Sequence, residues 1–149
     1  MWVRPLVVAV VALTLLGGCG SGDDGSGRSA NEVAEVLAEV ADGEIVEIDE
    51  NNDPNDLLGR PNGYKAAAVV KDPRLDEPCS DLGIECGVTV EQWASAGDAE
   101  DRSDYILTIL DDAPMLGSEY HYLDGAILVR VTGELPPSAA KEYETALTN

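Results

Sequence analysis

Residues 29–43 have the pattern of an amphipathic helix. Ser29 and Glu32 are spaced as a capping box, in which each side chain binds the backbone N–H of the other residue. The apolar residues that follow recur at i, i+3, i+4 and i+7: Val33, Val36, Leu37 and Val40. Gly43 lies where a glycine commonly ends a helix, so we predict one helix here.

Three segments after this helix have the composition or the alternation of strands, at residues 44–49, 64–71 and 87–94. The second has a face of small residues, which we interpret as the close approach of a packed neighbour. Residues 98–110 fit a helix, although residues 105–110 alone fit a strand equally well. Acidic residues at the start of this segment favour the helix, because carboxylates stabilise a helix N-terminus.

The dipeptide Asp124-Gly125 predicts a hairpin. With these residues as the turn, Tyr120 faces Val129, and Glu119 faces Arg130 in a cross-strand ion pair. One face then consists of core residues: Tyr120, Tyr122, Ile127, Val129 and Val131. The other face is mixed, and we expect it to be more exposed: Glu119, His121, Leu123, Leu128 and Arg130. A final helix starts near Pro137 and turns three residues inward: Ala140, Tyr143 and Leu147.

These elements give the order helix, three strands, helix, hairpin, helix. The sequence therefore predicts an α+β fold with a single largely antiparallel sheet, helices packed on one face and the approximate order αβββαββα. We assign residues 29–149 to one acidic domain, because that length suits a single domain.

Residues 1–18 have the pattern of an export signal. Arg4 is their only charged residue, and the uncharged, largely aliphatic run 6–16 follows it. A membrane-spanning helix needs about 20 apolar residues, so this run fits the shorter hydrophobic part of a signal peptide. Leu16-Gly17-Gly18-Cys19 comes next, and residues 20–28 have the Gly/Ser/Asp composition of a flexible linker.

Leu16-Gly17-Gly18-Cys19 resembles the lipobox of bacterial lipoprotein precursors, which is an aliphatic residue, two small residues and a cysteine. The resemblance implies cleavage after Gly18 and a diacylglyceryl group on Cys19, with palmitate among the attached chains. Residues 19–28 would then be the lipid anchor and linker, and the protein would lie on the extracytoplasmic face of the cell membrane. The alternative is an ordinary signal peptide with an incidental cysteine. The domain behind the linker resembles no particular family.

The chain is strongly acidic, with 29 Asp and Glu against 9 Lys and Arg and a net charge of −20. This charge argues against a nucleic-acid partner, because a phosphate backbone requires a basic surface. A single histidine, His121, excludes metal sites built from several histidines. His121 is also the one available imidazole base, but its place on the mixed hairpin face gives little reason to assign catalysis to it.

Cys79 and Cys86 are the cysteines that remain beside Cys19. A pair of cysteines in an exported domain is typical of a disulfide. Their spacing is not that of a thioredoxin-like redox pair, and zinc would need further ligands. We therefore predict a structural disulfide that fixes the loop between two strands.

The connection from Glu50 to Gly63 is fourteen residues long, and loops of that length in compact domains are often functional. We treat it and the neighbouring Cys79–Cys86 loop as the candidate recognition surface. The candidate recognition residues are Asp53, Asp56, Arg60 and His121. The run 49–56 is rich in carboxylates, which leaves calcium as an alternative, although the EF-hand spacing is absent.

No pattern of catalytic residues stands out in the sequence. The sequence therefore favours a non-enzymatic interaction or binding module, which is tethered to the membrane by its lipid anchor and has no cofactor. The partner expected from the net charge is a cationic protein or envelope component. The alternative is an extracytoplasmic small-ligand or calcium binder, or a hydrolase, that uses the acidic loop 49–63.

Overall fold

The structure, a computed structural model, describes residues 27–149. The predicted signal peptide, Cys19 and most of the predicted linker lie outside the described residues. Within 27–149, none of the helices has the length and the apolar character needed to cross a bilayer. The guanidinium of Arg28 donates to the carboxylate of Asp124 at 2.5 Å and to the carbonyl oxygen of Leu147 at 2.7 Å. The folded domain therefore includes Arg28, which the sequence placed in the linker.

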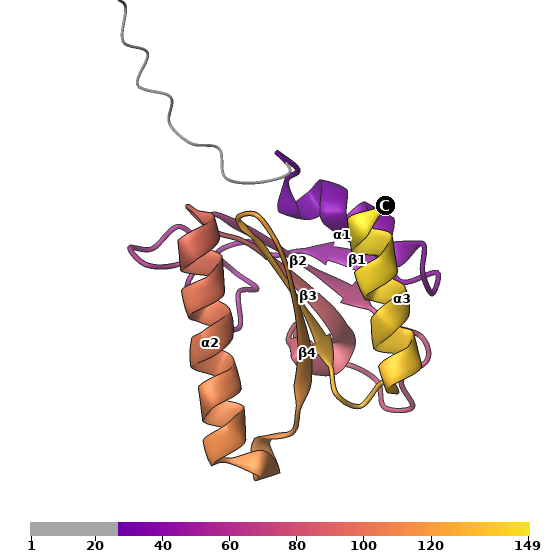
Figure 1. The fold of residues 1–149 in the computed structure, drawn as a ribbon. Helices are drawn as coiled ribbons and strands as arrows, with labels where there is room; N and C mark the ends of the chain where they lie inside the picture. The colour runs from indigo at the N-terminus through magenta and orange to yellow at the C-terminus, as the bar shows by residue number, and fades with distance from the viewer. Residues whose placement is uncertain (1–26) are drawn as a thin grey trace, which may run out of the picture.

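The described residues form a five-stranded antiparallel sheet (Figure 1). Its strands are β1 (Glu44–Glu47), β2 (Ala66–Lys71), β3 (Gly87–Gln92), β4 (Glu119–Asp124) and β5 (Ile127–Thr132). Their order across the sheet is β1-β2-β3-β5-β4, so β1 and β4 are the edges. Each of the first three is two residues shorter than predicted. The α+β class, the antiparallel sheet and the order of the elements are confirmed.

The same residues form α1 (Ala30–Ala38), α2 (Ala96–Asp112) and α3 (Pro137–Thr148), with short 3-10 helices η1 (Ile84–Cys86) and η2 (Pro114–Leu116). The predicted capping box opens α1, where the Glu32 carboxylate accepts from the Ser29 N–H at 2.7 Å. The ambiguous segment 98–110 is helical, and α2 begins after Ser95, whose hydroxyl accepts from the Asp98 N–H at 3.1 Å. Helix α3 buries its three predicted inward residues.

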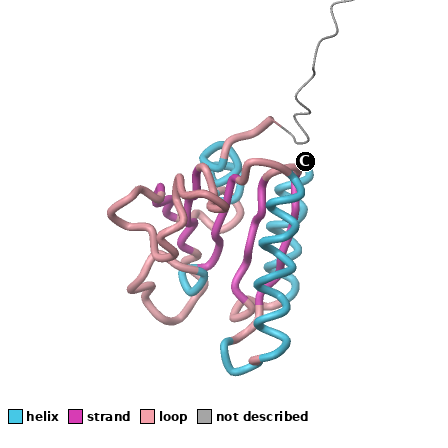
Figure 2. The backbone as a smooth tube through the Cα atoms, turned by 90° about the vertical axis from the view of Figure 1, so that its left-hand side faces the viewer, coloured by secondary structure: helices cyan, strands magenta, loops and turns pink. Residues whose placement is uncertain are grey.

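The helices are divided between the two faces of the sheet (Figure 1). Helices α1 and α3 pack on one face, over the main core built from alternate residues of β2, β3 and β5. Helix α2 covers part of the other face, and Figure 2 shows long loops gathered beside it. A smaller core forms there: Ile48, Tyr64, Ala67, Val69, Cys86, Trp93, Ala99 and Leu128. This arrangement corrects the prediction that the helices pack on one face, because the central strands are buried on both faces.

The hairpin of β4 and β5 turns one residue later than predicted. Gly125 and Ala126 form its loop, Gly125 has a φ of 57°, and Asp124 is already paired in β4. Tyr120 therefore faces Val131 rather than the predicted Val129. Each residue of β4 thus pairs with a residue of β5 two positions beyond the predicted one. Because side chains alternate between the two faces with a period of two, every side chain keeps its predicted face. The predicted core face is retained: Tyr120, Tyr122, Ile127, Val129 and Val131.

Candidate functional site

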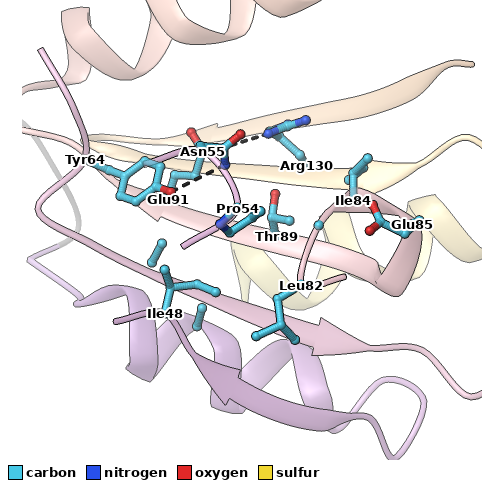
Figure 3. Close-up of a pocket in the computed structure, with 13 residues that line it drawn as sticks. Ile48, Pro54, Asn55, Tyr64, Leu82, Ile84, Glu85, Thr89, Glu91 and Arg130 are labelled. Atoms are coloured by element: carbon cyan, nitrogen blue, oxygen red, sulfur yellow. Dashed lines mark hydrogen bonds and ion pairs between the residues drawn. The ribbon is translucent and has the colours of Figure 1, made fainter. Parts of the chain in front are cut away.

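A cavity of about 210 Å³ lies on the face of the sheet that α2 and the long loops cover. Strands β2, β3 and β5 form its floor through four side chains: Ala67, Thr89, Glu91 and Arg130. One wall comes from the segment between β1 and β2: Ile48, Pro54, Asn55 and Tyr64. The disulfide loop forms the other wall (Figure 3): Leu82, Gly83, Ile84 and Glu85. The two loops that the sequence singled out therefore meet over one hollow.

The register of the strands brings the floor residues together. Thr89 pairs with Val69 on one side and with Arg130 on the other, and Ala67 pairs with Glu91. Directly opposed residues point to the same face of a sheet, so these side chains share one surface. Ala67 and Val69 are successive residues on this face of β2. Because the side chain of Ala67 is the smaller of the two, it leaves room for the cavity above it.

Thr89 lies at the centre of this floor, and Figure 3 shows its side chain between Pro54 and Ile84. The residue is only 8% exposed. Its hydroxyl oxygen is buried and has no hydrogen-bond partner among residues 27–149. Leaving a buried polar group unpaired destabilises a fold by roughly 1–3 kcal/mol. A ligand group that reached Thr89 would supply the missing partner.

A buried network of charged side chains borders the cavity. The guanidinium of Arg130 donates to both carboxylate oxygens of Glu119, at 2.8 Å each, and to Glu91 at 2.9 Å. Glu91 also accepts from the indole N–H of Trp93 at 3.1 Å, and its carboxylate lies 3.5 Å from the Nε of Arg102. Two carboxylates therefore face two guanidinium groups, and each charge in the network has an opposite neighbour.

Hydrogen bonds inside the network favour the charged forms of Glu119 and Arg130. Burial acts to raise the pKa of Glu119, but hydrogen bonds from Arg130 and His121 outweigh burial and lower that pKa to about 2. Burial opposes the charge on Arg130 as well, yet its contacts with Glu119 and Glu91 raise the pKa of the guanidinium above its usual range. The predicted ion pair of Glu119 and Arg130 is thus present, but as a buried pair.

His121 lies inside this network, which corrects the expectation of a more exposed hairpin face. Its side chain is 4% exposed. Its Nε2 lies 2.8 Å from Oε2 of Glu119, and its Nδ1 lies 2.8 Å from Oγ of Ser103. Helix α2 covers this face of the hairpin and supplies Ser103.

Ser103 is not among the candidates from the sequence. Ser103 lies between Ala99 and Ile106 on the buried face of α2, and this helical spacing in the sequence could have identified it as a buried residue. A serine, a histidine and a carboxylate in series have the composition of a catalytic triad. However, neither Ser103 nor His121 lines the cavity, so the cavity gives a substrate no access to them.

Asp53, a predicted recognition residue, holds one wall of the cavity in place. Its carboxylate accepts from the backbone N–H groups of Leu57 and Leu58, at 2.7 and 2.8 Å, and from the hydroxyl of Tyr64. Burial acts to raise the pKa of Asp53, but these hydrogen bonds lower it overall. Asp53 therefore caps the turn that follows it. It also positions the ring of Tyr64, which lies edge-on to the ring of Trp93 with 5.9 Å between the ring centroids.

Asp56 and Arg60 do not line the cavity. They form an exposed ion pair with each other instead. Within residues 27–149 there is no group of three or more His, Cys, Asp or Glu placed to hold a metal ion.

Cys79 and Cys86 form the predicted disulfide. Cys86 is buried at the end of η1, directly before β3, so the bond ties the outer loop to the sheet. Gly87 follows with a φ of 129°, and a Cβ there would lie 2.7 Å from the Cβ of Asp72, so this turn requires glycine. The disulfide thereby fixes the segment that carries Leu82 and Ile84 into the cavity wall.

The lining residues Thr89 and Glu91 were also missed from the sequence. They alternate with Val88 and Val90 along β3, and this alternation could have marked a polar face opposite the core. Comparisons of the chain with models of protein families, with curated proteins and with solved structures gave no match. The functional interpretation therefore rests on the geometry of the cavity.

Proposed function

We propose that this chain is an extracytoplasmic lipoprotein, anchored to the cell membrane through Cys19, whose domain binds a small molecule in the cavity without transforming it. The observation that carries the binding role is the buried, unpartnered hydroxyl of Thr89 on the floor of a hollow of about 210 Å³. Such a group destabilises the free protein and is satisfied when a ligand arrives.

The charges at the cavity support a role in binding rather than catalysis. Glu91 and Arg130 are the ionisable groups on the floor, and they form an ion pair with each other. Arg130 is also held by Glu119. A general base must be able to take a proton from a substrate, but the carboxylate of Glu91 is already occupied by the guanidinium of Arg130 and the indole N–H of Trp93.

Two features of the sequence support the location. The lipobox implies two acyl chains on Cys19, and two chains give stable anchoring. A structural disulfide is typical of compartments outside the cytoplasm. The linker would hold the domain away from an anionic membrane surface. The net charge of −20 would repel the domain from such a surface. The cationic protein or envelope partner rests on this net charge and stays a prediction.

Fractionation of bacteria that express the full chain tests the location. We expect the wild-type protein in the membrane fraction and the Cys19→Ser variant in the soluble fraction. The double variant Cys79→Ser/Cys86→Ser is the control, because it removes cysteines without removing the anchor, and it should stay with the membrane. Equal membrane association of wild type and Cys19→Ser would contradict the anchor.

Probe binding tests the cavity. The full chain, purified in detergent, is titrated with toluene and with benzyl alcohol while methyl NMR signals of Ile48, Leu82 and Ile84 are followed. We expect saturable shifts in the wild type and none in Ala67→Leu, whose larger side chain fills the hollow. Ala94→Leu makes the same change at an exposed alanine outside the cavity and should bind as the wild type does. Absence of shifts with both probes in the wild type would contradict the proposal.

A further inference from the structure

We propose that the cavity selects an uncharged small molecule with an apolar body and a hydroxyl group, and that this hydroxyl hydrogen-bonds to Thr89. The inference rests on the proposed binding function and adds the chemical class of the ligand. Three properties of the cavity carry it: the apolar walls, the balanced charges of the floor, and the hydrogen-bonding capacity that the floor leaves unused.

The walls suit an apolar body. Most of the side chains that stand above the floor are hydrocarbon in character: Ile48, Pro54, Leu82, Ile84 and the ring of Tyr64. Ala67 adds an apolar patch to the floor itself. Small-molecule sites are commonly built this way, with mostly apolar linings and a few polar groups that fix the orientation of the ligand.

The charges exclude an ion from the floor. Glu91 and Glu119 are balanced by Arg102 and Arg130, so these four side chains sum to zero. A charged ligand group beside them would lose its hydration without gaining an unpaired opposite charge, and this loss strongly opposes binding. Glu85 is exposed at the mouth, and together with the acidic surface it further opposes the entry of anions.

The unused hydrogen-bonding groups fit a hydroxyl. The hydroxyl of Thr89 can donate or accept. Arg130 has five N–H donors, and its contacts with Glu119 and Glu91 use three of them. Thr89 and Arg130 are directly opposed on β3 and β5, and both line the cavity. One ligand hydroxyl can therefore accept from Arg130 and either donate to Thr89 or accept from it.

Four probes that share a benzyl body separate these possibilities: toluene, benzyl alcohol, benzylamine and benzoate. Their affinities are measured by the NMR titration described above, with wild type, Thr89→Val and Thr89→Ser. Valine replaces the hydroxyl with a methyl group at nearly equal size, whereas serine keeps the hydroxyl. Partition of a probe into the detergent is the same for every variant, so it cancels when ratios of affinities are compared.

We expect the preference for benzyl alcohol over toluene to fall by about fivefold in Thr89→Val, because this variant loses one neutral hydrogen bond to the ligand. The preference should persist in Thr89→Ser, which keeps the hydroxyl. Benzylamine and benzoate should each bind about tenfold more weakly than benzyl alcohol, or worse. An unchanged preference in Thr89→Val, or tightest binding by either charged probe, would overturn the inference while leaving a binding cavity. If no probe binds, the proposed function fails with it.

Discussion

Replacement of Arg130 by methionine tests whether the charged network under α2 acts as a buried unit. Methionine keeps an unbranched apolar side chain but removes the cation and its three hydrogen bonds. Glu91 would still have Arg102 at 3.5 Å and the indole of Trp93. Glu119, in contrast, would keep only the contact with His121 among the side-chain contacts of the network.

The expected loss of stability follows from this burial. Arg130 is 8% exposed, and the side chain of Glu119 is 6% exposed. Removal of one partner from a buried pair destabilises proteins by about 3–5 kcal/mol, because the other charge stays buried without compensation. The double variant Arg130→Met/Glu119→Gln removes that stranded charge, so it should be more stable than Arg130→Met alone. With the single variant Glu119→Gln added, the three variants and the wild type form a double-mutant cycle that measures the coupling between the two side chains.

Urea unfolding at neutral pH is the assay, and Arg60→Met is the matched control. Arg60 is paired with Asp56, but these side chains are 57% and 80% exposed. An exposed pair contributes little to stability, so the control should unfold nearly as the wild type does. A loss for Arg130→Met that is no larger than the loss for Arg60→Met would show that the charged network does not stabilise the fold as a buried unit.

Three further predictions follow from the same contacts. The unfolded pKa of Glu119 is near 4.5 and its folded pKa is about 2, so its contribution to stability is complete above the unfolded value and is lost as the pH falls towards the folded value. Glu119→Gln should flatten this part of a plot of stability against pH; parallel curves for the two proteins would contradict the assignment. The double variant Cys79→Ser/Cys86→Ser should lose about 2.5 kcal/mol of unfolding free energy, from the entropy of the short loop, and should bind benzyl alcohol more weakly; unaltered affinity would show that the disulfide does not hold the cavity wall. Thr89→Val should raise the free energy of unfolding by about 1 kcal/mol, because a methyl group replaces a buried hydroxyl without a partner. Thr132→Val is its control, since the buried hydroxyl of Thr132 accepts from the Glu134 N–H at 3.4 Å, and this change should not stabilise; equal effects of the two valines would show that Thr89 is not a special position.

Local patterns predicted much of the fold because their causes are local. The capping box of α1 depends on residues three apart, and the two faces of the hairpin depend on alternation alone. The faces survived even though the turn moved from Asp124-Gly125 to Gly125-Ala126. The disulfide was predicted from the pairing of the cysteines and from the expected export of the chain.

The site depends on contacts between distant segments, and these could not be predicted from periodicity. The mixed face of the hairpin looked exposed because nothing in its own sequence shows that α2 lies over His121 and Arg130. The hollow over Thr89 forms because the segments before Tyr64 and after Cys79 meet above β3. Asp53 had the chemistry of a recognition residue, but the backbone N–H groups of Leu57 and Leu58 use its carboxylate.

A crystal structure of the full chain with benzyl alcohol tests the binding cavity most directly. We expect one probe molecule between the two loop walls, with its hydroxyl oxygen within hydrogen-bond distance of Thr89 Oγ1 and its ring against Leu82 and Ile84. Water alone in the hollow, or a probe bound only in an exposed groove such as the one lined by Trp93 and Tyr105, would contradict this expectation.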